Sequence, residues 1–396
     1  MKSNKIRLGE QCVVTSSKRF HLSERITQGV PFYCSKEIIK KFNGEDVTEC
    51  DYISEDLYKK VSNEFGVPKE NDLLITTRGT IGIPYLYKRT DRFYFADGNL
   101  TWIKDFDSNL YSKFLYYWFQ SYEGRKKFEA LAKGTAQKAV PISGIKTLEI
   151  ELPSLKSQKR IADILSAYDD LIENNQKQIK LLEEAAQRLY KEWFVDLRFP
   201  GHENTEIVDG VPEGWNEKTL SQVANVIMGQ SPKSEFYNSE KKGLPFHQGV
   251  GSYGVRFVMD DIYSTSYTRI AEPNSILFSV RAPVGRLNIT KNKVVIGRGL
   301  AAINQTDGCQ SYLYYLLKNK FFKDNIVGNG SIFASVSKDE LLNQKFLIPE
   351  RNLMMQFEKI VSQMDKQIEN LDSKNKKLIE ARDRLLPKLM SGEVEV

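Results

Sequence analysis

Residues 172–189 read IENNQKQIKLLEEAAQRL, and residues 368–385 read IENLDSKNKKLIEARDRL, so one helical segment occurs twice, 196 positions apart (368 − 172). The same offset holds without a gap back to Gly134 and Gly330. The duplicated unit therefore includes the end of the globular segment that precedes each helix. This self-similarity predicts a chain of two similarly built halves.

The likeness continues upstream with small shifts in spacing. LLITTRGTIG (73–82) resembles ILFSVRAPVG (276–285), and FLYYWF (114–119) resembles YLYYLL (312–317). Between these segments the two halves differ freely. A repeated scaffold with divergent segments between its matching stretches suits a protein that recognises two different targets with one arrangement of structural elements.

Each half combines short β-type runs with a helix rich in aromatic residues, which predicts an α+β fold. The β-type runs are DLLITT and TLEIELP in the first half, and SILFSV and KFLIP in the second. The aromatic helices are expected over SKFLYYWFQSYEGRKKFEALAKG and SYLYYLLKNKFFKDNI. The expected organisation is a first globular domain over 1–152, a central helix over 153–195, a linker over 196–215, a second globular domain over 216–349 and a C-terminal helix over 350–396.

Both predicted helices carry a heptad seam with a polar residue in it. Apolar positions at alternating spacings of four and three define each seam. In the first helix they are Ile161, Leu165, Tyr168, Ile172, Asn175, Ile179, Leu182, Ala186, Leu189 and Trp193; in the second they are Phe357, Val361, Met364, Ile368, Leu371, Asn375, Leu378, Arg382, Leu385 and Leu389.

The asparagines predict an antiparallel register. If Asn175 faces Asn375, Ile161 meets Leu389 and Trp193 meets Phe357, so the seams overlap from end to end. Paired asparagines satisfy each other's amides and fix register at some cost in stability. The alternative is that each asparagine faces solvent at a frayed point of the seam. The antiparallel pairing would place one globular half at each end of a rod of about 50 Å, related by an approximate two-fold axis.

Composition limits the classes of function. The net charge is +6 and lies in the globular segments, whereas residues 153–200 hold eight basic and eight acidic residues. This balance permits nucleic-acid binding without demonstrating it. No apolar run approaches the length of a membrane span, and the N-terminus does not resemble a secretory signal, so a cytoplasmic protein is expected. Cys12, Cys34, Cys50 and Cys309 lack metal-ligand or disulfide spacing.

Motifs for catalysis are missing from the sequence. There is no Pro-Pro dipeptide, as an adenine methyltransferase of the N/D-P-P-Y type would need, and neither a P-loop nor a G-x-S-x-G elbow occurs. Gly249, Gly251 and Gly254 form G-x-G-x-x-G, but KKGLPFHQ before them does not resemble an apolar strand. A self-sufficient methyltransferase or nuclease is therefore disfavoured, and a coiled-coil protein-interaction scaffold remains an alternative.

Several longer motifs resemble one family, the specificity subunits of type I restriction-modification systems. They are LPSLKSQKRIADILSAYDDLIENNQKQIKLLEEAAQRLYKEWFVDLRFPGHE with DGVPEGW, and GQSPKSEFYN, GLPFHQG, RAPVGRLNIT and IGRGLAAI in the second half. The first half has no counterpart of GQSP, which leaves its DNA-facing loops less defined.

The resemblance implies a non-catalytic chain with two target-recognition domains in a pseudo-two-fold arrangement, separated by two antiparallel coiled-coil helices. Each domain would read one half of a split site on double-stranded DNA. Two methyltransferase subunits carrying S-adenosylmethionine would dock on the chain, together with restriction subunits that use ATP and Mg. The chain itself would hold no cofactor and no metal.

Planar amide and guanidinium groups in loops are candidates for reading base edges. In the second half these loops offer Gln230, Ser231, Lys233, Tyr237, Asn238, His247, Gln248, Ser252, Tyr253 and Arg256. The repeated R-x-x-[IV]-G turn holds Arg78 and Arg281, which are expected either to contact phosphate or to form a structural ion pair, and Thr80 and Arg286 lie in or beside these turns. The loops before each helix add residues that could meet the DNA backbone or a base: Thr135, Gln137, Lys138, Asn329 and Ser331. For the loop residues, capping of structural loops is the alternative explanation.

The end of the first helix, RLYKEWFVDLRF, places aromatic side chains beside an arginine. Trp193, Phe194, Arg198 and Phe199 are candidates for docking a methyltransferase subunit. The alternative is that this cluster closes the helix onto a globular domain of the same chain.

Overall fold

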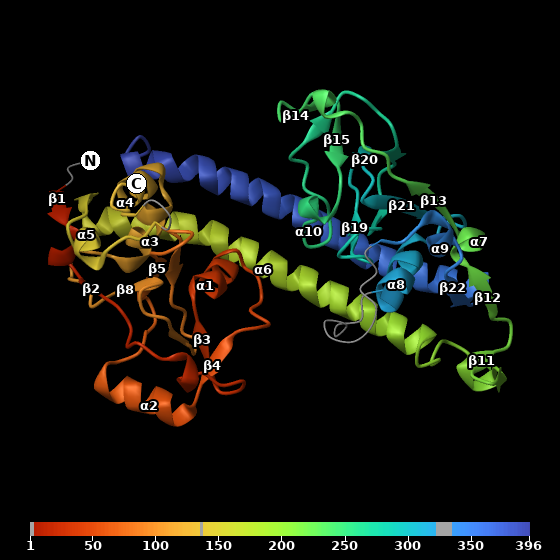
Figure 1. The fold of residues 1–396 in the computed structure, drawn as a ribbon, viewed down its shortest axis with the longest axis horizontal. Coiled ribbons are helices and arrows are strands. Elements are labelled where there is room, and N and C mark those ends of the chain that lie inside the picture. The colour runs from red at the N-terminus through yellow and green to blue at the C-terminus, as the bar shows by residue number, and fades with distance from the viewer. Residues whose placement is uncertain (1–3, 135–137, 322–334) are drawn as a thin grey trace. The chain divides into compact units, whose positions relative to one another are not determined.

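The computed structural model describes residues 4–134, 138–321 and 335–396. The chain forms two compact units. Unit 1 contains residues 1–177 and 372–396, and unit 2 contains residues 178–371. Two long helices, α6 (Leu155–Phe194) and α10 (Arg351–Ser391), are the continuous yellow-green and blue ribbons of Figure 1, and each contributes residues to both units.

The globular part of unit 1 is built on two small sheets and a strand pair. Its antiparallel sheet has the order β2 (Val13–Thr15), β8 (Leu100–Lys104), β5 (Leu73–Thr76), β6 (Pro84–Leu86). The second sheet has the order β4 (Asp51–Ile53), β3 (Val30–Tyr33), β7 (Tyr94–Phe95), and β1 (Asn4–Arg7) pairs with β9 (Glu149–Leu152). The helices are α1 (Ser35–Phe42), α2 (Glu55–Glu64), α3 (Ser112–Gln120), α4 (Tyr122–Glu129) and α5 (Ile142–Lys146).

Unit 2 repeats this plan with other lengths. Its first sheet has the order β13 (Ala224–Met228), β21 (Leu300–Gln305), β18 (Ile276–Ser279), β19 (Leu287–Ile289). Its second sheet has the order β14 (Tyr237–Asn238), β16 (Tyr263–Ser264), β15 (Leu244–His247), β20 (Val294–Ile296), β17 (Ile270–Ala271). Strand β12 (Asn216–Thr219) pairs with β22 (Lys345–Ile348), and the helices are α7 (Leu220–Val223), α8 (Gln310–Phe321) and α9 (Lys338–Leu342).

The internal repeat is therefore structural, as the sequence predicts. Helix α9 begins 196 residues after α5 (338 − 142), and β22 begins 196 residues after β9 (345 − 149). Strands β5 and β18 are buried at every position, because each lies inside its sheet and is covered by the core. The predicted α+β fold class is confirmed.

The aromatic helix of each half packs between its sheet and the long helices. In unit 1 the core joins Phe114 and Trp118 of α3 to Ile161 of α6 and Leu389 of α10. In unit 2 the core joins the tyrosines of α8 to Trp193 and Phe357 and to strand β18. Aromatic residues suit this position because each buries a large apolar area.

The aromatic helix of unit 1 is divided in two. Ser121 ends α3 by donating its hydroxyl to the carbonyl of Trp118 (2.7 Å), and the same oxygen accepts the amide of Gly124 (3.1 Å) at the start of α4. A Cβ at Gly124 would lie 1.9 Å from the Trp118 oxygen, so only glycine fits this corner. The sequence predicted one helix here, because its periodicity does not reveal the capping serine.

The predicted antiparallel register is present within each unit. In unit 1, Asn175 Nδ2 donates to Asn375 Oδ1 at 2.7 Å, and both side chains are buried. In unit 2, the rings of Trp193 and Phe357 lie 6.0 Å apart. The two residue numbers of each pair sum to 550, which is the sum required by the predicted seam.

The segment predicted as a linker is folded against unit 2. It contains a short 3-10 turn (His202–Asn204) and the hairpin of β10 (Ile207–Val208) and β11 (Val211–Pro212). Phe199 and Trp215, near its two ends, are buried in the main core of unit 2 with ring centroids 5.4 Å apart.

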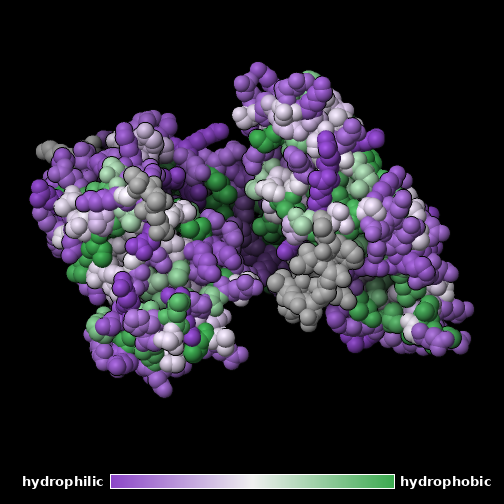
Figure 2. Space-filling model, viewed as in Figure 1, coloured by the Kyte–Doolittle hydropathy of each residue, from purple (hydrophilic) through white to green (hydrophobic). Residues whose placement is uncertain are grey.

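One face of the molecule is predominantly polar. The face in Figure 2 is mostly purple with scattered green residues. Within residues 4–134, 138–321 and 335–396, no helix combines the length and apolar character needed to span a membrane.

Candidate nucleic-acid interface

Both units contain the same hydrogen-bonded turn after their central strand. In unit 1 the Thr76 hydroxyl accepts the amide of Ile83 (2.9 Å), and the Thr76 carbonyl accepts the amide of Gly82 (2.8 Å). In unit 2 Ser279 makes the same bonds to the amides of Arg286 (2.8 Å) and Gly285 (3.0 Å). A hydroxyl residue and a glycine thus close the turn with the same pair of hydrogen bonds in two divergent sequences.

Each turn presents an exposed arginine at an equivalent position. Arg78 and Arg281 lie two residues after the hydroxyl residue, and both are exposed. Arg78 forms a β-bridge with Ala139, and Arg281 forms one with Ser335. Because 335 − 139 is 196, the segment before each long helix supports its turn at the same place in both units.

A surface hollow of about 660 Å³ lies beside the turn of unit 2. It is lined by Ser231, Pro232, Lys233, Ser234, Glu235, Tyr237, Gln248, Arg281 and Arg298. A smaller hollow of about 200 Å³ adjoins it and shares Gln248 and Arg281. The cations and the amide of these walls match the chemistry of phosphates and base edges.

Unit 1 has a corresponding hollow of about 310 Å³ beside Arg78. Its lining is more apolar and comprises Ser16, Thr77, Arg78, Gly98, Leu100, Thr101, Lys133, Ala139, Val140, Pro141 and Ile142. The two hollows share the turn and its arginine, whereas their other lining residues differ between the units.

Four of the predicted base-reading residues line the hollow of unit 2, together with the shared turn arginine Arg281: Ser231, Lys233, Tyr237 and Gln248. Of these, Gln248, Lys233 and Arg281 are exposed. Tyr237 instead supports the wall, because its ring stacks on Phe246 at 4.6 Å and its hydroxyl donates to the Pro232 carbonyl (2.8 Å).

Other candidates are exposed beyond these walls. Gln230, Thr80 and Lys138 are exposed, and so is Arg286, whose amide belongs to the turn. Thr135, Gln137, Asn329 and Ser331 lie outside the described residues.

Four predicted base readers instead form hydrogen bonds within unit 2: Asn238, His247, Ser252 and Tyr253. Asn238 accepts the amides of Glu240 and Lys242 and donates to the carbonyl of Lys242. The hydroxyl of Tyr253 donates to the carbonyl of Leu277 (3.1 Å). His247 is 1% exposed and is held by the Ser252 hydroxyl (2.8 Å) and by Asp260 (3.1 Å). For His247 the structure contradicts base reading, because its ring is enclosed and both nitrogens have partners.

Arg256 was predicted to read bases, and the structure contradicts this prediction most clearly. Its side chain is 2% exposed and pairs with Asp365 of α10 (2.5 Å) and with Glu183 of α6 (3.3 Å). Its guanidinium also donates to the hydroxyl of Tyr315 (3.1 Å) and lies 4.3 Å from the centre of the Tyr314 ring. Burial raises the pKa of the Asp365 carboxyl, and Arg256 opposes that shift. Arg256 therefore anchors its loop to both long helices and does not face solvent.

The glycine motif around Gly249 does not form a dinucleotide loop. Contrary to the sequence-based expectation, strand β15 does precede it. Only a 3-10 turn, Val250–Ser252, follows, and a phosphate-binding loop of this type needs an α-helix at that point.

The sequence profile of the family described as "Type I restriction modification DNA specificity domain" matches residues 3–184 and 212–381. The chain belongs to this family. It is similar to a putative type I restriction enzyme specificity subunit, MjaX, of Methanocaldococcus jannaschii, at 30% identity over 81% of this chain and 77% of the relative. The MjaIX specificity subunit of the same organism is 28% identical over 72% of this chain and 69% of its own length.

A solved structure has the same fold. The crystal structure of a type I restriction-modification S subunit from M. genitalium matches with a TM-score of 0.61 at 20% identity, covering 98% of this chain and 96% of that one. The two profile matches in one chain of this specificity-subunit family correspond to the two halves of the internal repeat.

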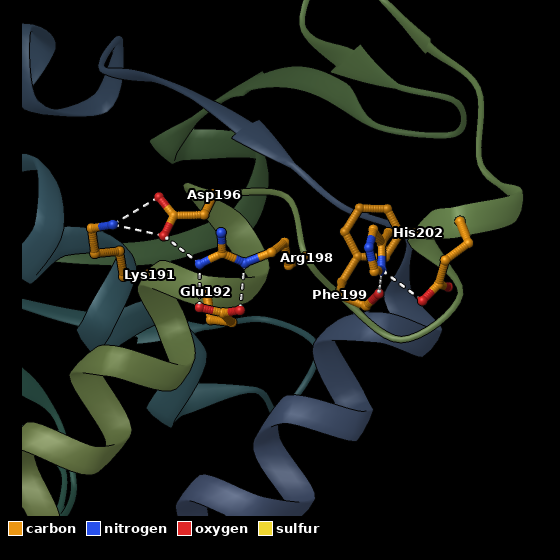
Figure 3. A network of polar contacts seen from close by, with 7 residues as sticks. Lys191, Glu192, Asp196, Arg198, Phe199 and His202 are labelled. Carbon is orange, nitrogen blue, oxygen red and sulfur yellow. Dashed lines mark hydrogen bonds and ion pairs between the residues drawn. The ribbon is translucent and has the colours of Figure 1, made fainter.

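The candidate partner-binding residues of this family member lie around the end of α6. Trp193 and Phe199 are buried, and Phe194 packs on Phe357 with ring centroids 5.2 Å apart. In Figure 3, Arg198 donates two hydrogen bonds to Glu192 (2.5 and 2.7 Å). The aromatic residues thus close the helix onto unit 2 of the same chain, which was the alternative to partner docking.

Arg298 is the one cation lining the hollow that the sequence analysis missed; Pro232, Ser234 and Glu235 were also not predicted. It lies in IGRG, at the start of the segment IGRGLAAI, which is one of those that carry the family resemblance. The glycine on each side was the available signal, because paired glycines often mark a close backbone approach.

Proposed function

We propose that this chain is the non-catalytic DNA-specificity subunit of a type I restriction-modification complex, and that each unit reads one half of a split duplex site. The observation that carries the proposal is the turn shared by both units. It presents Arg78 and Arg281 at equivalent positions, while the other residues that line the two hollows differ. Two different half-sites would be read by a shared turn for the common contacts and by different lining residues for the different bases.

The long helices would then set the distance between the half-sites and dock two methyltransferase subunits. A continuous helix of 40 residues is about 60 Å long, which exceeds one turn of duplex DNA of about 34 Å. S-adenosylmethionine would be bound by the methyltransferase partners, and ATP and Mg by restriction subunits. The methylated adenine would have to leave the base stack, so this chain would orient the duplex and could bend it.

Duplex binding at several salt concentrations tests this proposal against a protein-interaction scaffold. The complex of the chain with the methyltransferase subunits should bind duplex DNA with log K falling linearly with log salt, because each phosphate contact releases counterions. Absence of duplex binding at low salt would contradict it.

Labelled S-adenosylmethionine separates a specificity subunit from a self-sufficient methyltransferase. The isolated chain should transfer no label to DNA, whereas the complex should. Appreciable transfer by the pure chain would refute the non-catalytic role.

A further inference from the structure

In the tip between β20 and β21, residues 297–299, each of the three backbone amides donates a hydrogen bond. The amide of Arg298 donates to the Ser231 hydroxyl (3.2 Å). The amide of Gly297 donates to the carbonyl of His247 (2.8 Å), and that of Gly299 donates to the carbonyl of Gln248 (3.1 Å). Three consecutive amides are therefore fixed to two neighbouring segments.

Close packing requires glycine at position 299 and leaves little room for a side chain at position 297. A Cβ at Gly297 would lie 2.9 Å from the Ser231 hydroxyl oxygen, and a Cβ at Gly299 would lie 2.4 Å from the Gln248 carbonyl oxygen. The backbone at Arg298 is thus enclosed on both sides, whereas Arg298 itself is exposed and lines the large hollow. A rigid backbone under one exposed guanidinium is a preorganised recognition element.

In unit 1 the position equivalent to Arg298 is occupied by a glycine, and the nearby cation Arg19 pairs with Asp97 (2.8 Å). The strands that follow begin at Leu100 and Leu300, an offset of 200, so the counterpart of Arg298 is Gly98. Nothing lies within 4 Å of a Cβ built on Gly98. The turn arginines Arg78 and Arg281, in contrast, occur in both units. A feature shared by two different readers suits sequence-independent phosphate contact, and a feature of only one suits base reading.

We propose that Arg298 is a specificity-determining residue of unit 2 that reads a guanine edge in the major groove, while Arg281 contacts phosphate. The proposal rests on the proposed function of the chain. The guanidinium fork matches the O6 and N7 atoms of guanine at once, which a lysine ammonium does not. The fixed backbone lowers the entropy lost when that bidentate pair forms.

Selection from a random duplex pool tests this assignment. The complex of the full chain with its methyltransferase subunits is incubated with the pool, bound duplexes are sequenced, and affinities are measured at several salt concentrations. The variants are Arg298→Ala, Arg298→Lys and Arg281→Ala. All three change exposed side chains, so folding is expected to be kept.

Arg298→Ala should abolish the preference for one guanine in one half of the split motif, a loss of roughly 5- to 150-fold in discrimination. Arg298→Lys should lose the same preference while keeping the wild-type salt slope. Arg281→Ala should keep the whole motif and reduce the magnitude of the salt slope by about one.

Retention of the full wild-type motif by Arg298→Ala would overturn the assignment of Arg298 alone. Loss of a base preference in Arg281→Ala would overturn its assignment to phosphate. If the wild-type complex selects no split motif, the proposed function itself fails, so the two failures are distinguishable.

Discussion

The two units anchor their aromatic helix to the long helices through the same carboxylate position but with different cations. In unit 1, Asp169 accepts the Tyr117 hydroxyl (2.5 Å) and pairs with Arg382 of α10 (2.6 Å). In unit 2 the equivalent acid is Asp365 (169 + 196), and its cation is Arg256. Arg382 belongs to a long helix, whereas Arg256 belongs to a recognition-domain loop.

The difference follows from one position in the repeat. The α6 residue equivalent to Arg382 is Ala186 (382 − 196), which is buried and carries no charge. The loop residue Arg256 supplies the missing cation, and Glu183 adds a second carboxylate to it. In unit 1 the long helices provide both charges of the pair. In unit 2 a loop that differs between the units provides the cation, and this ion pair fixes the loop to the long helices.

The largest effect is expected from Arg256→Ala. Two carboxylates would lose a cation that is 2% exposed, and breaking a buried pair by removing one partner costs about 3–5 kcal/mol. Hydrogen exchange followed by mass spectrometry should show a loss of protection in unit 2 while unit 1 keeps the wild-type rates.

A matched variant separates lost charge from lost packing. Replacing the whole cluster by apolar residues (Arg256→Met, Glu183→Leu and Asp365→Leu) should recover much of the protection, because no buried charge is left unpaired. Protection of Arg256→Ala equal to the wild type would show that the loop docks without its arginine.

A smaller effect is expected at the asparagine pair. Asn175→Leu removes the donor to Asn375 and leaves a buried amide unsatisfied, at a cost of about 1–3 kcal/mol. The double variant Asn175→Leu, Asn375→Leu should be at least as stable as the wild type, because an apolar seam replaces a polar pair. Urea unfolding of the three proteins measures this, and a single variant as stable as the double would contradict the role of the hydrogen bond.

The smallest effect is expected from Arg382→Ala in unit 1. The side chains of Arg382 and Asp169 are 23% and 27% exposed, and Asp169 keeps the Tyr117 hydroxyl. Partly exposed pairs contribute about 1 kcal/mol or less. Hydrogen exchange should change modestly and only in unit 1; a loss as large as that of Arg256→Ala would remove the contrast between the two anchors.

The scaffold was predictable because it is periodic and duplicated. Burial of one seam per helix sets the register, so Asn175 and Asn375 could be paired from spacing alone. Contacts in loops were less predictable, because residue type does not reveal burial. Arg256 and His247 have side chains suited to base reading but are enclosed, whereas Arg298 is exposed above a tightly packed backbone.

The central claim, that this chain specifies a split DNA site, is tested most directly by mapping methylated adenines in the genome of the host with and without the gene. The account predicts one asymmetric motif in two parts that is methylated in the parent and unmethylated throughout the deletion strain. An unchanged methylation map, or the loss of a continuous motif, would contradict it.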